Sequence, residues 1–228
     1  MALDRTLLHF VLDPFSRAVR LALGEKRLEF AETPVRYWEH PEALTRLNPA
    51  GLPPVLVDGR GREAVTICGS TPILEHLEER FEGAPLLPAD AAGRAEARRL
   101  VAWFDRKFDY EVNGLLLHEK MEKRLLGLGA PELAALRAGR EALRAHMGVV
   151  EALLAERDWL AGPALTLADL AAAAHLSVAD YLGEVPWNDH RHARSWYARI
   201  KSRPSFRPLL NDRQPGLPPA AHYDDLDF

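Results

Sequence analysis

The apolar positions of the first 83 residues change between runs of strand length and stretches of helical spacing. Residues 6–12 form a continuous apolar run, which is typical of a strand that is covered on both faces. Residues 17–26 carry apolar side chains at helical spacing, and a second apolar run follows at residues 28–35. This strand–helix–strand order predicts a right-handed unit with two parallel strands.

The pattern then predicts a short helix, a β-hairpin and a third helix. The short helix is expected at residues 41–47, and the hairpin at residues 55–67, around the turn signal Asp58-Gly59. Ser70 or Thr71 is expected to cap the helix that follows the hairpin. The first 83 residues therefore have the predicted order βαβαββα.

Two adjacent prolines precede the first strand of the hairpin. Proline cannot donate a hydrogen bond to a sheet, so Pro53 and Pro54 are expected at the entrance of this strand, where we also expect a cis X-Pro bond. Such a bend would leave backbone groups beside the strand that can pair with an extended ligand.

Strand patterns end after Pro88, and the apolar residues that follow have helical spacing. Thr166 and Asp169 form a capping box at the start of one of these helices. The expected helices span residues 91–126, 131–157, 166–182 and 191–201. The expected organisation is an N-terminal domain (1–83), a linker (84–90), an all-helical domain (91–210) and a Pro-rich, acidic and aromatic tail (211–228).

Composition and charge narrow the classes of partner. The 228 residues carry a formal net charge of −4, which gives no electrostatic case for nucleic acid or an anionic membrane. The most apolar long segment, residues 165–182, contains Asp169, His175 and Asp180, so we expect a buried helix there and no membrane insertion. Cys68 is the only cysteine, which favours a cytoplasmic protein without internal disulfides.

Isolated chemical groups predict neither a metal site nor a nucleophile. His190 and His192 lie close together in a polar segment that is typical of a solvated surface. Cys68 has no neighbouring basic residues and is interpreted as a small core residue. We expect no metal and no cofactor.

Two motifs give the chain a resemblance to a known family. Residues 48–56, Asn-Pro-Ala-Gly-Leu-Pro-Pro-Val-Leu, match the pattern Asn-Pro-x-Gly-x-x-Pro-x-Leu, and Gly162 with Leu165-Thr-Leu-Ala-Asp169 matches a helix-capping motif. In this order and spacing, they resemble the cytosolic glutathione transferase superfamily. The resemblance implies an α/β thioredoxin-like N-terminal domain followed by an all-α helical bundle domain, with Pro54 as the cis-proline.

The resemblance also shows where this chain departs from the family. Asp13 stands where the family places a Ser, Cys or Tyr that donates a hydrogen bond to the glutathione thiolate. An ionised carboxylate can only accept, and it repels a thiolate. Ser16 is either a substitute donor or a helix cap. Gly69 precedes Ser70 where the family has an acid, so Ser70 and its helix terminus can receive a carboxylate, but nothing there holds the ammonium group.

We therefore interpret Asp13, Ser16, Pro54 and Ser70 as a vestigial glutathione pocket without catalytic residues. The residues argue against both glutathione binding and enzyme activity. One alternative is a glutathione S-transferase with atypical thiol activation through Ser16. Another is a binding protein for a different small carboxylate at the helix terminus of Ser70.

The tail is the main candidate for a binding surface. Its last residues interleave acids with apolar side chains, as do segments that become ordered on a partner, although a frayed terminus is the alternative interpretation. Trp38 is a second candidate. Three placements are open for it: packing on its own domain, a dimer interface, or exposure to a protein partner. The partner-binding residues of the tail are predicted to be Asp224, Asp225, Leu226, Asp227 and Phe228.

The combination of Asp13, Gly69-Ser70 and the acidic aromatic end resembles one group within the superfamily more closely. These are bacterial glutathione-transferase-like proteins that bind FtsZ, the tubulin-like division polymer. The resemblance implies a cytoplasmic, non-enzymatic homodimer at the division site that bundles or curves FtsZ filaments and regulates constriction. Two identical binding surfaces on one dimer can bridge filaments even when each contact is weak.

Overall fold

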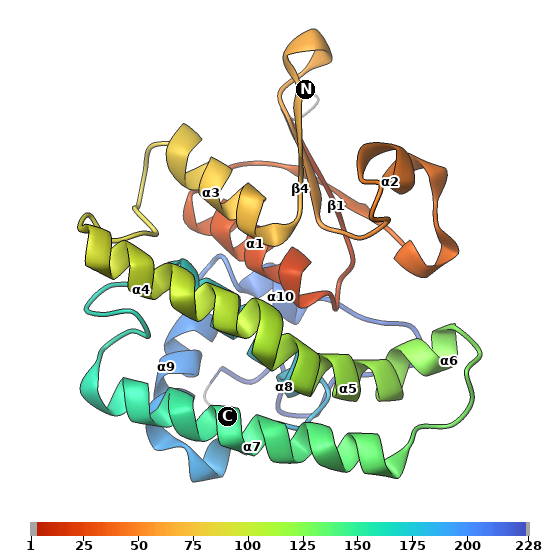
Figure 1. Ribbon diagram of the computed structural model, residues 1–228, viewed down its shortest axis with the longest axis vertical. Coiled ribbons are helices and arrows are strands. Elements are labelled where there is room, and N and C mark those ends of the chain that lie inside the picture. The colour runs from red at the N-terminus through yellow and green to blue at the C-terminus, as the bar shows by residue number, and fades with distance from the viewer. Residues whose placement is uncertain (1–3, 227–228) are drawn as a thin grey trace.

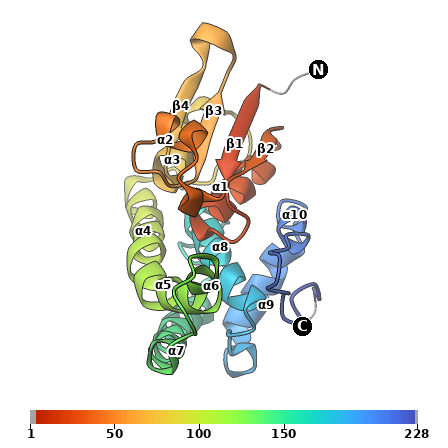
Figure 2. The same ribbon diagram turned by 90° about the vertical axis from the view of Figure 1, so that its right-hand side faces the viewer.

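A computed structural model of the protein describes residues 4–226 in two layers of structure (Figure 1). The predicted partner residues Asp227 and Phe228 lie outside the described residues. A small mixed sheet with its helices forms one part, at the top of both ribbon views, and a set of helices forms the other (Figure 2). This is the predicted fold class.

The sheet has four strands in the order β2-β1-β3-β4. Strand β1 pairs in parallel with β2, as the strand–helix–strand pattern predicts, and it pairs antiparallel with β3, which pairs antiparallel with β4. The strands are β1 (Arg5–His9), β2 (Ala31–Pro34), β3 (Val55–Asp58) and β4 (Val65–Cys68). Strand β1 is shorter than its apolar run because the Phe10 carbonyl accepts from Asp13 N at 3.1 Å, in a turn toward the next helix.

Alternation of side chains along β1 and β3 divides the core between the two faces of the sheet. Leu7 and Leu56 pack in the main core with residues of α1 (Pro14–Glu25) and α3 (Ser70–Arg80). Leu8 and Val55 pack instead with Leu44 of α2 (Glu42–Leu47). The two faces are therefore covered by different helices, and α1 lies between the sheet and the helical domain.

Short 3₁₀ turns interrupt the connections of the sheet. One, η1 (Tyr37–Glu39), follows β2, and another, η2 (Gly61–Glu63), lies in the β3–β4 hairpin. Gly59 begins the hairpin turn with a positive φ of 97°, which agrees with the predicted Asp-Gly signal. Gly69, also at positive φ, is the N-cap of α3, so the prediction of Ser70 or Thr71 as the cap is wrong and Ser70 is the first helical residue.

The expected helix at residues 91–126 is one helical stretch with changes of pitch. It begins as α4 (Ala91–Ala102), continues through the π-helical segment η3 (Trp103–Asn113) and α5 (Gly114–Leu117), and ends through a second π-helical segment, η4 (His118–Glu122), and α6 (Lys123–Leu125). Such π-helical turns are rare and often lie at functional sites.

The remaining helices surround a buried central one. All residues of α8 (Leu167–Tyr181) are buried, and the predicted capping box of Thr166 and Asp169 is present at its start. Within residues 4–226, no helix combines the length and the apolar composition needed to cross a bilayer. The other helical elements are α7 (Leu133–Glu156), η5 (Trp187–Asp189), α9 (Arg191–Lys201) and α10 (Arg207–Leu210), the last of which the pattern does not predict.

The tail has no helix between residues 211 and 226, as its prolines predict, but it is packed against the helical domain. In Figure 2 it runs in dark blue beside α9 and α10. Tyr223 is fully buried, and its ring meets that of Tyr181 edge-to-face with centroids 5.2 Å apart. Residues 224–226 follow this buried side chain and are exposed.

Candidate functional site

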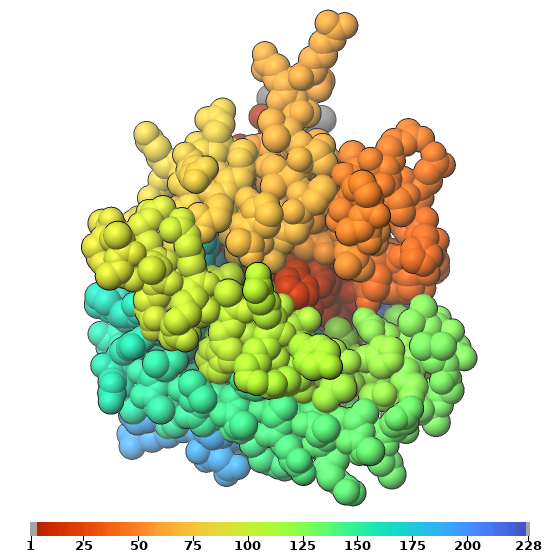
Figure 3. Space-filling view, viewed as in Figure 1, coloured from red at the N-terminus to blue at the C-terminus, as the bar shows by residue number. Residues whose placement is uncertain are grey.

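A recess lies between the two domains, at the end of the sheet where α1 and α3 begin. Its volume is about 450 Å³, and red atoms of the N-terminal segment are visible at its bottom (Figure 3). Pro53, Pro54 and Ser70 line one side, Phe15 comes from α1, and Asp105 comes from the helical domain. The recess therefore contains two of the four residues predicted to form the vestigial pocket.

The proline turn has the predicted geometry but few groups to offer a ligand. The Pro53–Pro54 bond is cis, as expected. Neither proline has an N–H group, and the Pro54 carbonyl already accepts from Gly69 N at 2.9 Å. A complete strand-like pairing needs a donor as well as an acceptor, and the two prolines can supply only acceptors. The expected pairing with an extended ligand therefore stays a prediction.

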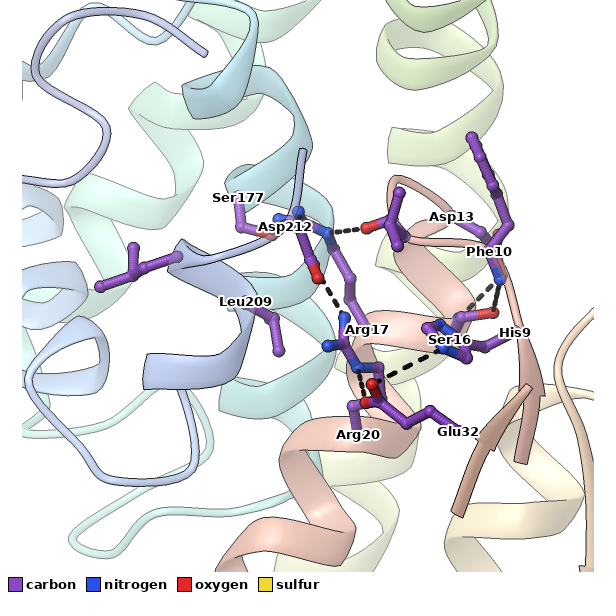
Figure 4. Close-up of polar contacts among 12 residues, drawn as sticks. His9, Phe10, Asp13, Ser16, Arg17, Arg20, Glu32, Ser177, Leu209 and Asp212 are labelled. Atoms are coloured by element: carbon purple, nitrogen blue, oxygen red, sulfur yellow. Dashed lines mark hydrogen bonds and ion pairs between the residues drawn. The ribbon is translucent and has the colours of Figure 1, made fainter. Parts of the chain in front are cut away.

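Asp13 is the N-cap of α1. Its Oδ2 accepts hydrogen bonds from the backbone N–H and the side-chain hydroxyl of Ser16. Ser16 is fully buried, and its Oγ also accepts from Phe10 N at 3.4 Å (Figure 4). The interpretation of Ser16 as the cap is therefore wrong, and its hydroxyl proton is committed to Asp13 instead of facing a substrate.

The charge of Asp13 is weaker than the sequence suggests. Burial raises the pKa of Asp13 to about 7, although the hydrogen bonds from Ser16 act in the opposite direction. The negative charge of Asp109 also raises this pKa. At neutral pH the carboxyl group is thus partly protonated, which corrects the expectation of a fully ionised acid at this position.

The start of α3 already holds a carboxylate from the other domain. Ser70 Oγ and Thr71 Oγ1 both donate to Asp105 Oδ2 at 3.2 Å, and His175 Nε2 lies 3.1 Å from Asp105 Oδ1. A ligand carboxylate would have to displace Asp105 from these hydroxyls and would be repelled by it. The Ser70 hydroxyl is therefore already engaged, and the expectation that Ser70 and its helix terminus receive a ligand carboxylate stays a prediction.

Asp105 supplies an acidic side chain beside Ser70, where the sequence itself has Gly69 and no acid. It brings a negative charge to the recess from a helix of the second domain, 35 residues along the chain from Ser70. Sequence reasoning missed it because no local motif connects the two positions. The electrostatics of the recess consequently favour cationic groups and oppose anionic ones.

Cys68 lines the recess, but the structure gives it no activating partner among the described residues. Its Sγ donates to the Leu47 carbonyl at 3.4 Å, and burial raises the pKa of the thiol. A raised pKa keeps the thiol protonated and unreactive. Across residues 4–226, no group of three His, Cys, Asp or Glu side chains is arranged to hold a metal ion.

A second polar cluster, which the sequence did not predict, joins α1 to the tail (Figure 4). Arg17 is fully buried and donates to Ser177 Oγ at 2.8 Å, to Tyr223 Oη at 2.9 Å and to Asp212 Oδ2 at 3.1 Å. Arg20 donates to the same Asp212 oxygen at 2.7 Å. The tail is therefore fixed to the N-terminal domain through buried ion pairs.

His9 lies at the edge of this cluster. Burial lowers the pKa of His9 to about 4, and the positive charge of Arg20 acts in the same direction. The ring is therefore neutral at physiological pH. Neither ring nitrogen has a hydrogen-bond partner among the described residues.

Trp38 is half-buried and packs on its own domain. Its ring meets that of Phe10 edge-to-face at 5.3 Å and that of Tyr37 at 5.2 Å. It also lines a groove of about 580 Å³ together with Arg213. Arg213 in turn forms an ion pair with Asp224 at 2.7 Å, so the groove and the exposed end of the tail are contiguous.

Comparison with known proteins agrees with this architecture. Residues 14–80 match the family model "Glutathione S-transferase, N-terminal domain", and residues 121–204 match "Glutathione S-transferase, C-terminal domain". FtsZ-localized protein A of Caulobacter vibrioides is 66% identical over 228 residues, which is 100% of both chains.

Solved structures show the same relationship. The structure titled FzlA from C. crescentus has a TM-score of 0.97, 66% identity, and coverage of 99% of this chain and 100% of that chain. A glutathione S-transferase from Rhodospirillum rubrum has a TM-score of 0.94, 48% identity, and coverage of 98% and 100%. The chain belongs to the glutathione S-transferase family, with both the N-terminal and the C-terminal domain of that fold.

Proposed function

We propose that this protein is a non-catalytic member of the family that binds and organises FtsZ filaments and thereby regulates bacterial cell division. The observation that carries the proposal is the 66% identity to FtsZ-localized protein A, which extends over the whole of both chains and includes the tail. We further propose that it acts as a cytoplasmic homodimer at the division site, since two identical surfaces can bridge neighbouring filaments.

The chemistry of the recess supports a role without catalysis. Activation of a thiol needs a donor or a positive charge near the sulfur. Here the recess and its surroundings contain Asp13 and Asp105, while the Ser16 hydroxyl donates to Asp13. These groups oppose the formation of a thiolate, which weakens the case for a transferase.

The tail and the Trp38 groove together form the surface that we propose for the partner. This tail face comprises Trp38, Arg213, Asp224, Asp225 and Leu226. Asp224 and Leu226 are exposed beyond the buried Tyr223, and the Arg213–Asp224 ion pair joins them to the groove. An apolar group surrounded by acids can combine steering with a hydrophobic contact. Asp227 and Phe228 belong to the same proposal.

The test is co-sedimentation of the protein with polymerised FtsZ. Asp224→Lys, Leu226→Asp and Asp227→Lys should each reduce the amount that sediments, because they change the charge or the apolar contact of the tail face. Glu141→Lys, an exposed acid on α7, is the control with the same change of charge. Breaking the exposed Arg213–Asp224 pair should cost less than about 1 kcal/mol, so the melting temperature should stay nearly unchanged. Full binding by all three tail variants would overturn the role of the tail.

A glutathione S-transferase activity is the second candidate, because the similar protein from R. rubrum is a glutathione S-transferase. The partly protonated Asp13 supports it as well, since a carboxylic acid can donate a hydrogen bond. Calorimetric titration with glutathione and turnover of 1-chloro-2,4-dinitrobenzene separate the two candidates. We expect neither glutathione binding nor turnover. Saturable binding of glutathione, together with a turnover rate that changes in the Asp13→Asn variant, would favour the transferase.

A further inference from the structure

We propose that the protein binds a small organic ammonium ion in a second cavity between the two domains, where carboxyl groups and aromatic rings meet. This cavity has a volume of about 110 Å³ and shares Phe15 with the larger recess. It is distinct from the tail face, so the inference does not depend on the proposed partner.

Three carboxyl groups from different elements line the cavity. Asp13 comes from the start of α1, Asp109 from η3 and Glu122 from the end of η4. Glu122 is already hydrogen-bonded, because Tyr37 Oη donates to its Oε1 and His118 Nδ1 lies 2.9 Å from its Oε2. Asp13 also accepts two hydrogen bonds, both from Ser16 and both at Oδ2, so the charge that neutral donors compensate least lies on Asp109 and on Oδ1 of Asp13.

The neighbouring histidine offsets only part of this charge. His175 Nδ1 lies 3.6 Å from Asp109 Oδ1, and its attraction partly offsets the rise that burial causes in the pKa of Asp109 and, as a smaller cause, in that of Asp13. This one ring is shared with Asp105, whose Oδ1 lies 3.1 Å from Nε2. Within residues 4–226, no lysine or arginine forms an ion pair with Asp13 or Asp109. A cation is the group that is missing from this cavity.

Asn113 provides an independent observation that points to a ligand. Its side chain lines the cavity and is 2% exposed. The Nδ2 group donates to the ring and to the carbonyl of His175, whereas Oδ1 has no hydrogen-bond partner in the described part of the chain. A buried carbonyl oxygen without a donor is unfavourable, and native structures rarely leave one. A ligand N–H group in the cavity would satisfy it.

The aromatic lining selects an organic cation over a metal ion. Phe10, Phe15 and Tyr37 contribute rings to the walls, and ring faces attract ammonium groups. Across the described ranges no metal-binding group of side chains exists. A cavity of about 150 Å³ holds a benzene molecule, so this one accommodates about four or five non-hydrogen atoms. These properties fit a primary ammonium head on a short alkyl chain.

The directions of the pKa shifts of Asp13 and Asp109 agree with a cationic ligand. Burial raises the pKa of Asp13 and of Asp109, and repulsion from nearby carboxylates adds to the rise, although the Ser16 hydrogen bonds to Asp13 and the attraction of His175 for Asp109 act in the opposite direction. Both groups therefore resist ionisation in the absence of a cation. An ammonium ion beside them would stabilise their charged forms.

The ligand test uses an isosteric series with the full-length protein. Propylammonium, 1-propanol and propionate have the same size but differ in charge, and sodium chloride keeps the ionic strength equal. In ¹H–¹⁵N NMR spectra, we expect saturable shifts of the Asn113 side-chain amide and of the Asp109 and Gly114 backbone amides with propylammonium only. Equal shifts from 1-propanol, or no shift with propylammonium at 100 mM, would overturn the proposal.

Two charge-removing variants locate the site. Asp109→Asn should weaken propylammonium binding about tenfold, as expected for loss of a charged hydrogen-bond acceptor. Asp13→Asn should have the same effect and keeps a residue that caps α1 well. The matched control is Glu111→Gln on the same segment, η3, where Glu111 pairs with Lys107 and with His146 of α7. Unchanged binding in a folded Asp109 or Asp13 variant, or equal weakening in the control, contradicts the assignment.

Discussion

At the scale of a single residue, Asp13 should make the stability of the protein depend on pH. Its folded pKa of about 7 lies above the ordinary value of 3.8, so the folded state binds the proton more tightly than the unfolded state. The stability that this group contributes is fully present below pH 4 and is lost as the pH rises toward 7. Above pH 7 the ionised carboxyl destabilises the fold by at most about 4 kcal/mol.

The variant Asp13→Asn should remove this dependence. Urea unfolding of the wild type and the variant at pH 4, 5, 6, 7 and 8 gives the difference in unfolding free energy at each pH. We expect the difference to shift in favour of the variant up to pH 7 and then to level off, because other titrating groups contribute equally to both proteins. A difference that is independent of pH would show that Asp13 keeps an ordinary pKa in the folded state.

The same residue shows what the sequence could and could not predict. The turn after β1 and the presence of an acid at its end were visible in the pattern, but the geometry of the cap was not, because Asp13 and Ser16 are both good capping residues. The contact of Asp105 with the start of α3 could not be predicted from the sequence. A contact between residues 35 positions apart in different domains depends on packing, which no local pattern encodes.

At the scale of an element, the start of α8 depends on one carboxylate. Asp169 accepts from Thr166 N at 2.9 Å, from Leu160 N at 2.9 Å and from Trp196 Nε1 at 2.9 Å. The capping box itself was predicted from the sequence and is confirmed. The bonds to Leu160 and Trp196 were not predicted, because they bring a loop and α9 to the helix from distant positions.

This arrangement predicts different costs for the two members of the box. Thr166→Ala should lower the unfolding free energy by about 1 kcal/mol, as for other caps. Asp169→Ala should cost at least twice as much, because it leaves the buried Trp196 and Leu160 N–H groups without acceptors. Chemical denaturation measures both, and Glu141→Ala on the exposed face of α7 is the control. Equal costs for Thr166 and Asp169 would mean that Asp169 acts only as a cap.

The helix at residues 91–126 illustrates a limit of pattern reading at the same scale. Its existence and extent were predicted, but its π-helical segments were not. Gly114 N donates to the Asp109 carbonyl in this region, and a Cβ atom at Gly114 would lie 3.1 Å from that oxygen. Asp109 and Asn113, four residues apart in η3, line the same cavity, but the hydrophobic spacing does not indicate the π-helical pitch.

At the scale of the whole molecule, the buried cluster around Arg17 connects the two domains and the tail. Arg17 bonds the Val11 carbonyl at 2.7 Å as well as Ser177, Asp212 and Tyr223, so a single side chain joins the end of β1, α8 and the tail. The sequence predicted an acidic aromatic tail without helix, and residues 211–226 contain no helix. It could not predict that Tyr223 is buried, because its partner Arg17 lies 206 positions earlier in the chain.

The variant Arg17→Met should therefore destabilise the fold and release the tail. It leaves Asp212, which is nearly buried, with Arg20 as its remaining ion-pair partner, so the cost should be smaller than the loss of about 3–5 kcal/mol that a buried charge without any partner causes. Tyr223→Phe, which keeps the ring and removes the hydroxyl, should cost about 1–3 kcal/mol because Arg17 Nη1 loses an acceptor.

Hydrogen exchange and limited proteolysis separate release of the tail from general unfolding. In Arg17→Met, the backbone amides of residues 212–226 should exchange faster, and this segment should be cleaved earlier, than α8. The tail loses the bonds from Arg17 to Asp212 and Tyr223 and keeps only the Arg20–Asp212 pair to α1, whereas α8 loses one side-chain bond and stays packed in the core. Arg213→Met removes an arginine of the same tail whose pair with Asp224 is exposed, and it should change neither measurement by much. If the tail stays protected in Arg17→Met while the global stability falls, its position is determined by the packing of the Tyr223 ring on Tyr181, and the ion pairs contribute only to the fold. If the tail is released, the same variant should also weaken the proposed binding to FtsZ without altering any residue of the tail face.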